Sequence, residues 1–158
     1  WHGGTWAFPM RDARDNMIGI RLRDGKGHKW AVKGSKQGLF LPDRKPDKTL
    51  FIVEGPTDCA AALTLGLSAI GRPSCLGQED LILQYIRLYS VNRTIIICDN
   101  DEPGLRGTAK LQTKLPIPST IFIPPVKDLR EFLQLGGTAE MIDSATKDLV
   151  WQMPGRCT

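Results

Sequence analysis

Two stretches of sequence decide the fold of this chain: FIVEGPTD at residues 51–58 and IIICDNDEPG at residues 95–104. Each begins with an unbroken apolar run, which is typical of a central parallel strand buried on both faces. Each run ends close to a carboxylate, Glu54 in the first stretch and Asp99 in the second. Pro56 stands at a favourable first position of a helix, so the first stretch predicts a strand that leads directly into a helix.

Strands and helices alternate around these two stretches. Strands are expected at residues 50–53, 68–70, 94–98 and 120–123. Helices are expected at residues 57–65, 79–89, 103–115, 129–135 and 139–144. Because strands that alternate with helices form parallel sheets covered on both faces, the predicted fold class is α/β, with a Rossmann-like core of about four parallel strands flanked by helices.

The first third of the chain has a different character. Short strands are expected at residues 5–11, 17–23 and 29–33, with a hairpin turn at 12–16. The stretch 42–48 holds two prolines and five charged residues and predicts a boundary. The predicted division is a small strand-rich subdomain at 1–48, a main domain at 49–146 and a C-terminal tail at 147–158.

Charge is distributed unevenly along the chain. Residues 1–48 hold 11 Lys and Arg against 5 Asp and Glu, residues 49–158 hold 10 against 12, and the whole chain carries +4. A basic first part and a locally acidic second part suit a polyanion held by the one and a metal ion held by the other. The alternative is that the basic part is only a well-solvated surface.

Several classes of protein are disfavoured by the sequence. No apolar run approaches the roughly 20 residues that span a bilayer, and no signal peptide is recognisable, so no membrane partner is expected. The four cysteines show no C-x-x-C spacing, so a zinc site is not expected. Because the chain opens at Trp1 rather than Met, we expect it to be part of a longer protein.

Carboxylates are expected to gather at one edge of the sheet. Ligands of open α/β sheets bind beyond the carboxyl ends of the strands, where Glu54, Asp99 and Asp101 would meet. Asp58, one turn into the first helix, and Asp128, after the last strand, can face the same place. Taken singly, each acid is better explained as a helix cap or a turn residue. As a set at the ends of two apolar strands, they favour a site.

A hard divalent cation would relieve the repulsion within such a cluster. Neighbouring carboxylates force one another to protonate unless a positive charge neutralises them. Mg²⁺ prefers oxygen ligands and is usually held by a few carboxylates together with waters and substrate phosphates. The predicted cofactor is therefore Mg²⁺, or Mn²⁺ in its place, and the predicted ligands are Glu54, Asp58, Asp99, Asp101 and Asp128.

The two quoted stretches resemble the paired motifs of TOPRIM domains. Residues 51–58 are similar to the first motif, a strand that ends in Glu-Gly with an Asp four residues after the Glu. Residues 95–104 are similar to the second, a D-x-D motif followed by a Gly. Gly71 stands where the family has a turn after its second strand. Residues 125–129, PVKDL, resemble the segment of bacterial DnaG-type and phage-type primases that carries a further acid.

The resemblance to primases extends upstream of the first motif. Residues 4–11, 18–23 and 27–40 are similar to the N-terminal part of the primase RNA-polymerase domain, in which basic hairpins face the template and the incoming nucleotide. The candidates for these contacts are Arg11, Arg21, Lys29 and Lys33. Two more are Lys127, beside Asp128, and Arg106, which begins a basic helical stripe that is better explained as a solvated face.

What the resemblance implies is a primase-like nucleotidyltransferase, a DNA-directed RNA polymerase that makes RNA primers during DNA replication. Its catalytic residues would be Glu54, Asp99 and Asp101, acting with Mg²⁺. The implied partners are a single-stranded DNA template, ribonucleoside triphosphates and, through regions outside this sequence, a replicative helicase. The implied location is the cytoplasm, at the nucleoid or the replication fork.

One departure from the family and several rival functions stay open. Those primases usually have a second acid two residues after the position of Asp128, where this chain has Arg130, so the site is open to one metal ion or two. A TOPRIM nuclease would use the same acids to nick DNA, and a non-catalytic module would only bind DNA. A topoisomerase needs a tyrosine nucleophile, but Tyr85 and Tyr89 fall in an ordinary amphipathic helix. A phosphatase built on D-x-D is disfavoured, because it leaves Glu54 without a role.

Overall fold

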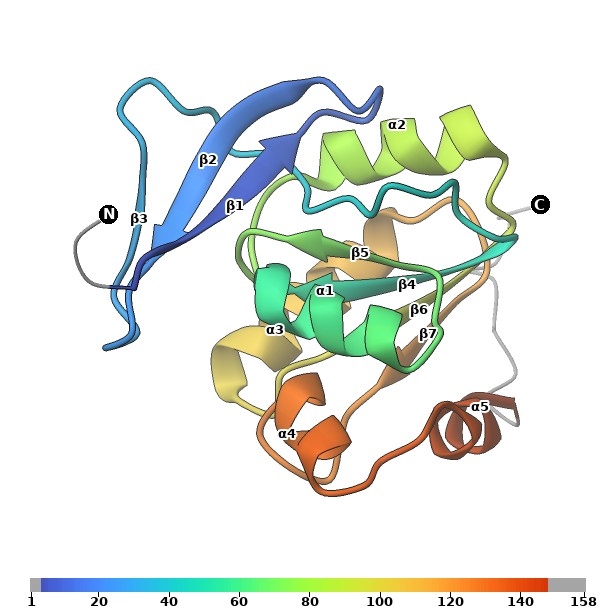
Figure 1. Cartoon of the computed structure of the whole chain (residues 1–158). Helices are drawn as coiled ribbons and strands as arrows, with labels where there is room; N and C mark the ends of the chain where they lie inside the picture. The colour runs from blue at the N-terminus through green and yellow to red at the C-terminus, as the bar shows by residue number, and fades with distance from the viewer. Residues whose placement is uncertain (1–3, 148–158) are drawn as a thin grey trace.

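Two β-sheets form the frame of the molecule in the computed structural model, which describes residues 4–147 (Figure 1). The small sheet is antiparallel and consists of β1 (Trp6–Arg11), β2 (Met17–Arg23) and β3 (Lys29–Ala31), in that order. The large sheet is parallel, in the order β5-β4-β6-β7. Its strands are β4 (Thr49–Glu54), β5 (Ala69–Arg72), β6 (Arg93–Ile97) and β7 (Ser119–Phe122).

Five helices connect and follow the strands of the large sheet within residues 4–147. They are α1 (Gly55–Thr64), α2 (Glu79–Tyr89), α3 (Glu102–Lys114), α4 (Leu129–Gln134) and α5 (Ala139–Lys147). None of the described helices is long and apolar enough to cross a membrane. The predicted fold class is confirmed: a four-stranded parallel sheet flanked by helices follows a small strand-rich sheet.

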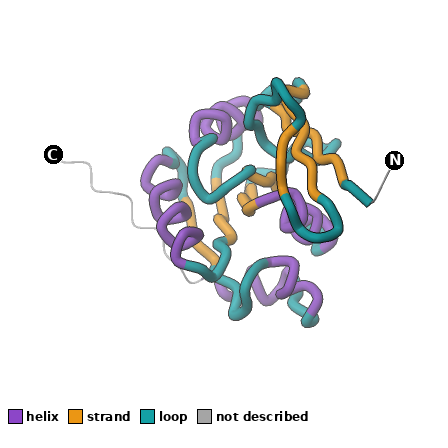
Figure 2. The backbone as a smooth tube through the Cα atoms, turned by 90° about the vertical axis from the view of Figure 1, so that its left-hand side faces the viewer, coloured by secondary structure: helices purple, strands orange, loops and turns teal. Residues whose placement is uncertain are grey.

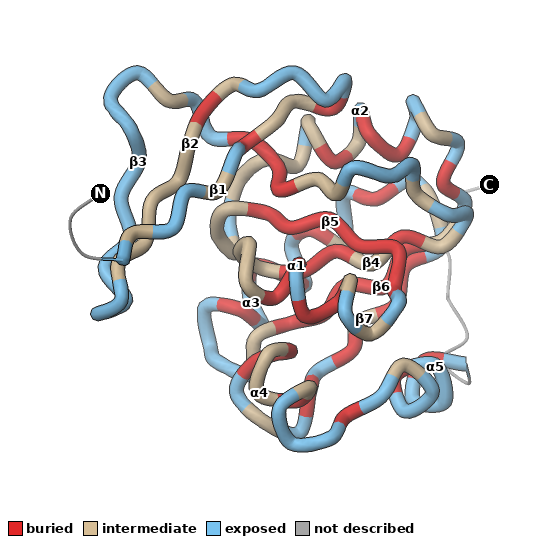
Figure 3. Tube along the Cα trace, in the orientation of Figure 1, coloured by how far each residue is buried: buried red, intermediate tan, exposed pale blue. Residues whose placement is uncertain are grey.

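The large sheet separates two apolar cores, and helices cover both of its faces (Figure 2). Along β4, Leu50 and Ile52 face the core formed with α2 and α3, whereas Val53 faces the core formed with α1, α4 and α5. This alternation explains why the run at residues 50–53 is apolar at every position, because both faces of a central parallel strand are buried. Figure 3 shows the buried residues concentrated along these strands.

Residues 39 and 40 join the two sheets through backbone hydrogen bonds. The N–H of Leu39 donates to the carbonyl of Arg11, and the N–H of Arg11 donates to the carbonyl of Leu39, both at 2.8 Å. Phe40 pairs in the same way with Gly71 of β5, at 2.8 and 2.9 Å. The small sheet is therefore tied to the β5 edge of the large sheet, beside which it lies in Figure 1.

Several element boundaries differ from the prediction by one to three residues. α1 begins at Gly55 rather than at residue 57, β3 ends at Ala31 rather than at residue 33, and α5 continues to Lys147 rather than ending at residue 144. The sequence predicts a strand that stops before a turn at Gly71, but β5 continues to Arg72, because Val53 and Glu54 of β4 pair with Gly71 and Arg72. The stretch 42–48 is bonded to the loop before β5, since Arg44 donates to the carbonyl of Leu67 at 2.8 Å. The division into domains stays a prediction, and of the predicted tail at 147–158 only Lys147 lies within the described residues.

Gly71 has no room for a side chain, and this gives a prediction for stability. A Cβ at Gly71 would lie 2.7 Å from the carbonyl oxygen of Gly55 and 3.2 Å from the Cβ of Phe40. We expect Gly71→Ala to lower the free energy of unfolding by about 1–3 kcal/mol, because overpacking forces the backbone apart. The matched control is Gly25→Ala, where a Cβ meets nothing within 4 Å. Urea denaturation of both variants tests this, and equal stabilities would contradict it.

Candidate functional site

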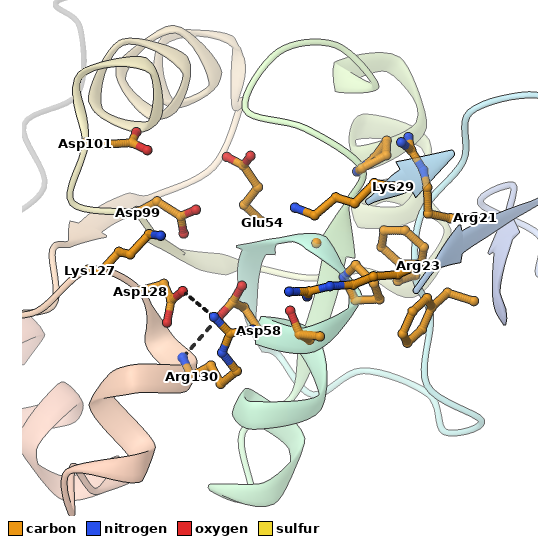
Figure 4. A pocket seen from close by; sticks show the side chains of 16 residues that line it. Arg21, Arg23, Lys29, Glu54, Asp58, Asp99, Asp101, Lys127, Asp128 and Arg130 are labelled. Carbon is orange, nitrogen blue, oxygen red and sulfur yellow. Dashed lines mark hydrogen bonds and ion pairs between the residues drawn. The ribbon is translucent and has the colours of Figure 1, made fainter. Parts of the chain in front are cut away.

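The five predicted acids converge on one hollow beyond the carboxyl ends of the parallel strands (Figure 4). Glu54 is the last residue of β4, and Asp99 follows β6, the strand that pairs with β4. Asp101 and Asp128 stand at the N-caps of α3 and α4, and Asp58 lies in the first turn of α1. All five side chains line a cavity of about 320 Å³.

The loop that carries Asp99 and Asp101 is held by short backbone contacts. The N–H of Asp101 donates to the carbonyl of Asp99 at 2.8 Å, and that of Asn100 donates to the carbonyl of Lys127 at 2.8 Å. The side chain of Asp101 accepts from the N–H of Gly104 at 2.7 Å. A Cβ at Gly104 would lie only 2.5 Å from the carbonyl oxygen of Asp99, so the first turn of α3 approaches this loop only with glycine there.

Burial and mutual repulsion hold these acids away from their ordinary ionisation. The pKa of Asp99 is raised to about 7, first by burial and then by the charges of Glu54, Asp58, Asp128 and Asp101. The pKa of Asp58 is raised to about 6, first by burial and then by Asp128. Burial also raises the pKa of Glu54, against the opposing effect of Arg72. The acids therefore lie closer to one another than their full ionisation favours, although five basic side chains also line the hollow.

Arg130 contacts two of the five acids. Its Nη2 forms an ion pair with Oδ2 of Asp128 at 3.1 Å, and its backbone N–H donates to Oδ1 of Asp58 at 3.0 Å. Oδ1 of Asp128 accepts from the N–H of Glu131 at 2.8 Å. No ion pair joins Glu54, Asp99 or Asp101 to a basic side chain in the part of the chain that the structure describes.

The donor set fits a hard, partly hydrated cation. Across residues 4–147, no group of three or more His, Cys, Asp or Glu side chains is arranged so that it could hold a metal ion by itself. Mg²⁺ does not require such a cage, because it keeps several waters and uses one or two carboxylates together with substrate phosphates. Glu54 and Asp99 offer only oxygen and carry charge without an ion-pair partner among the described residues, which suits Mg²⁺ or Mn²⁺.

The structure brings together only half of the predicted basic residues. Arg21, Lys29 and Lys127 line the same hollow as the acids. Arg11 and Arg106 lie outside the hollow, and each forms an ion pair with an acid four residues further along or back in the sequence: Arg11 with Asp15 at 3.5 Å and Arg106 with Glu102 at 3.1 Å. Lys33 follows β3 on an exposed turn outside the hollow.

Three arginines at the site are not among the residues predicted from the sequence. Arg23 lines the hollow two residues after Arg21, and the two-residue period of a strand was a signal that could have found it. Arg130 was noted only as a departure from a family pattern. Arg72, only 2% exposed, lies opposite Glu54 in the register of β5 and donates to the carbonyl of Cys75 at 2.8 Å. Nothing in the sequence marked Arg72, because its place depends on the strand register.

The raised pKa of Asp99 predicts how stability depends on pH without metal. The folded protein keeps this proton up to about pH 7, whereas the unfolded chain releases it near its ordinary pKa of 3.8. The resulting stabilisation is complete below about pH 4 and is lost as the pH rises to about 7. In EDTA, Asp99→Asn should therefore raise the melting temperature above that of wild type by several degrees at pH 8, and not at pH 4.

The control for this prediction is Asp43→Asn, which removes an exposed carboxylate from the loop before β4. The melting-temperature difference between Asp43→Asn and wild type should be the same at pH 4 and at pH 8. Thermal unfolding followed by circular dichroism measures both variants. A melting-temperature difference for Asp99→Asn that does not change between pH 4 and pH 8 contradicts the raised pKa.

Comparisons with known proteins agree with this arrangement. The Toprim-like family model matches residues 51–133, which include all five acids. No curated protein matches the chain at a significant level. Among solved structures, the primase fragment of the bacteriophage T7 primase-helicase protein is similar with a TM-score of 0.72 and 19% identity, over 88% of this chain and 61% of that one.

Two further structures are similar over most of the chain. One is the complex of bacteriophage T7 lagging-strand DNA polymerase with primase domains of two gp4 subunits bound to an RNA/DNA hybrid and dTTP. The TM-score there is 0.73 at 18% identity, over 88% of this chain and 75% of that one. The other is the DnaG catalytic core, with a TM-score of 0.64 and 20% identity, over 87% of this chain and 50% of that one.

The two T7 matches and the DnaG match establish the fold, and the family model covers more than half of the chain. This chain spans about three fifths of the T7 primase fragment and half of the DnaG core. The chain belongs to the Toprim-like family, with a TOPRIM domain whose fold is of the primase type.

Proposed function

We propose that this protein is a primase-like nucleotidyltransferase that makes RNA primers on single-stranded DNA during replication, with Mg²⁺ or Mn²⁺. The observation that carries the proposal is the composition of one hollow. Carboxylates from the ends of β4 and β6 face Arg21, Arg23 and Lys29 from the small sheet across it. Joining a nucleotide to a growing chain needs both acidic and basic side chains. Carboxylates hold the metal ion, and arginine and lysine side chains hold the phosphates.

The acids would bind the cation and leave it open to substrate. Glu54, Asp99 and Asp101 are the proposed catalytic residues, and Asp58 and Asp128 complete the acidic wall of the hollow. A divalent cation bound there would supply activation of a 3′-hydroxyl and stabilisation of the leaving pyrophosphate. Arg72 would keep Glu54 ionised, because its guanidinium is the strongest influence opposing the effect of burial on the Glu54 pKa.

The basic side chains would bind phosphate oxygens of the triphosphate or the template. Arg21 supports this role, since its Nε is buried and has no hydrogen-bond partner among residues 4–147. A buried guanidinium N–H without an acceptor is costly, so an acceptor brought by a substrate would relieve it. Lys29 is directed toward Glu54 in Figure 4 and lowers the pKa of that carboxyl, so it would bridge the two sides of the hollow.

The structural relatives support this proposal without extending it to the whole protein. The similar T7 complex contains primase domains bound to an RNA/DNA hybrid and dTTP. The similar T7 fragment comes from a primase-helicase protein, which makes a replicative helicase the proposed partner here and the replication fork in the cytoplasm the proposed location. A topoisomerase, which needs a tyrosine nucleophile, is not supported. Tyr85 is 2% exposed, the ring centroids of Tyr85 and Tyr89 are 4.7 Å apart, and neither residue lines the hollow.

Metal binding that depends on the triphosphate is the first test of this proposal. We expect calorimetry to detect Mg²⁺ or Mn²⁺ binding that a ribonucleoside triphosphate strengthens, because phosphate oxygens complete the shell of the ion. Glu54→Gln and Asp99→Asn should each weaken this binding by at least tenfold. Asp43→Asn, which removes a carboxylate outside the hollow, should leave it unchanged.

Other results of the same titration would favour the rival functions. Metal binding that is indifferent to the triphosphate would point to a nuclease, and nicking of plasmid DNA by the protein would then be expected. An absence of metal binding would leave a domain that only binds DNA. Either result contradicts the proposal.

Binding to single-stranded DNA provides a second prediction. The double variant Arg21→Ala/Lys29→Ala should weaken binding severalfold at low salt and reduce the salt dependence, by about 0.7 in the logarithmic slope for each phosphate contact that is lost. The matched control is Lys45→Ala, an exposed lysine outside the hollow. Fluorescence anisotropy against salt concentration measures both variants, and equal slopes would show that the small sheet does not contact the nucleic acid.

A further inference from the structure

The five acids of the hollow divide into two groups by their partners. Asp58 and Asp128 are 7% and 6% exposed, and both are contacted by Arg130. Glu54, Asp99 and Asp101 are more open and form no ion pair with a basic side chain of residues 4–147. The Arg130 guanidinium thus pairs with Asp128, and its positive charge also acts on Asp58.

Arg130 holds its two acids by different atoms, which fixes its position. The backbone N–H binds Asp58 at 3.0 Å, and the guanidinium binds Asp128 at 3.1 Å. Asp128 also accepts from the N–H of Glu131, so both of its carboxylate oxygens have protein donors. These bonds join the start of α4 to the first turn of α1, two elements that pack closely together.

A second divalent cation would meet unfavourable conditions beside Asp58 and Asp128. It would have to displace the guanidinium or sit within a few ångströms of it, and the repulsion between two positive charges is strong at such distances in a partly buried site. Glu54 and Asp99 have no basic side chain within ion-pair distance among the described residues, and Arg72 and Lys29 act on Glu54 without pairing with it. The carboxylates without an ion pair are therefore the part of the cluster where a divalent cation meets the least repulsion.

We propose that Arg130 is the resident counter-ion of Asp58 and Asp128, and that the site consequently binds a single divalent cation, at Glu54 and Asp99. This inference rests on the proposed function, because it specifies how many ions the proposed metal site takes. It assigns Arg130 as a positioning residue: the guanidinium neutralises one half of the acidic cluster and directs the ion to the other half.

The number of bound Mn²⁺ ions tests this inference without an activity assay. Electron paramagnetic resonance of free Mn²⁺, with Mn²⁺ alone as the probe, counts the ions bound at saturation. We expect one ion for wild type, two for Arg130→Gln, in which the freed acids accept a second and weaker ion, and one for Arg130→Lys, which keeps the charge. Arg87→Gln removes an exposed arginine from α2 as the control and should bind one ion.

The outcomes separate failure of this inference from failure of the proposed function. Two ions in wild type, or one ion in Arg130→Gln with the wild-type affinity, would overturn the role of Arg130 and leave the metal site standing. No bound ion in wild type would overturn the proposed function itself, and the inference with it.

A charge-neutral variant keeps the test decisive if Arg130→Gln does not fold. Removing Arg130 alone leaves Asp128 buried without its counter-ion, which destabilises proteins strongly. The double variant Asp128→Asn/Arg130→Gln replaces the ion pair by two neutral amides. We expect it to bind one Mn²⁺ with a dissociation constant within about threefold of wild type, since Asp128 is not a ligand of the single ion. A loss of tenfold or more would make Asp128 a ligand and overturn the inference.

Discussion

Four backbone hydrogen bonds made by Leu39 and Phe40 are the contact on which the rest of the structure depends. They tie the small sheet to the edge of the large one, at Arg11 on one side and Gly71 on the other. Backbone pairing fixes direction and register, so the basic side chains of β2 and β3 come to lie opposite the carboxyl ends of β4 and β6. Without this junction the acids would form one wall of a site with no basic wall facing it.

Repulsion among the five acids of the hollow is the second constraint on the structure, and it disfavours ionisation of the carboxylates. Asp99 is half-buried among four other carboxylates, and its pKa rises to about 7 as a result. Arg130 and Arg72 relieve parts of this repulsion from opposite sides, the one beside Asp58 and Asp128 and the other beside Glu54. The remaining repulsion between carboxylates is concentrated where a cation and a triphosphate would bind. Functional sites commonly hold such unfavourable charge arrangements until a ligand binds.

The sequence was sufficient for most of the fold and for the acidic wall, and insufficient for the basic one. Apolar runs identify buried strands, and a strand end identifies where an acid will lie, so Glu54 and Asp99 could be predicted from local patterns. Arg72 could not, because only the register of β5 brings it opposite Glu54. Arg11 and Arg106, whose role in nucleic-acid binding stays a prediction, lie outside the hollow and each pairs with an acid four residues away. Local sequence indicates which residues are charged, whereas tertiary structure decides which charges meet.

Template-directed synthesis is the most direct test of the account as a whole. The measurement is incorporation of labelled ribonucleotides into oligonucleotides by the protein on single-stranded DNA in Mg²⁺, with Asp99→Asn/Asp101→Asn as the comparison. If the protein is a primase-like nucleotidyltransferase, RNA products form only with template and metal, and they disappear in the double variant. Products that persist in the double variant, or a wild-type protein that cuts the template and synthesises nothing, would contradict it.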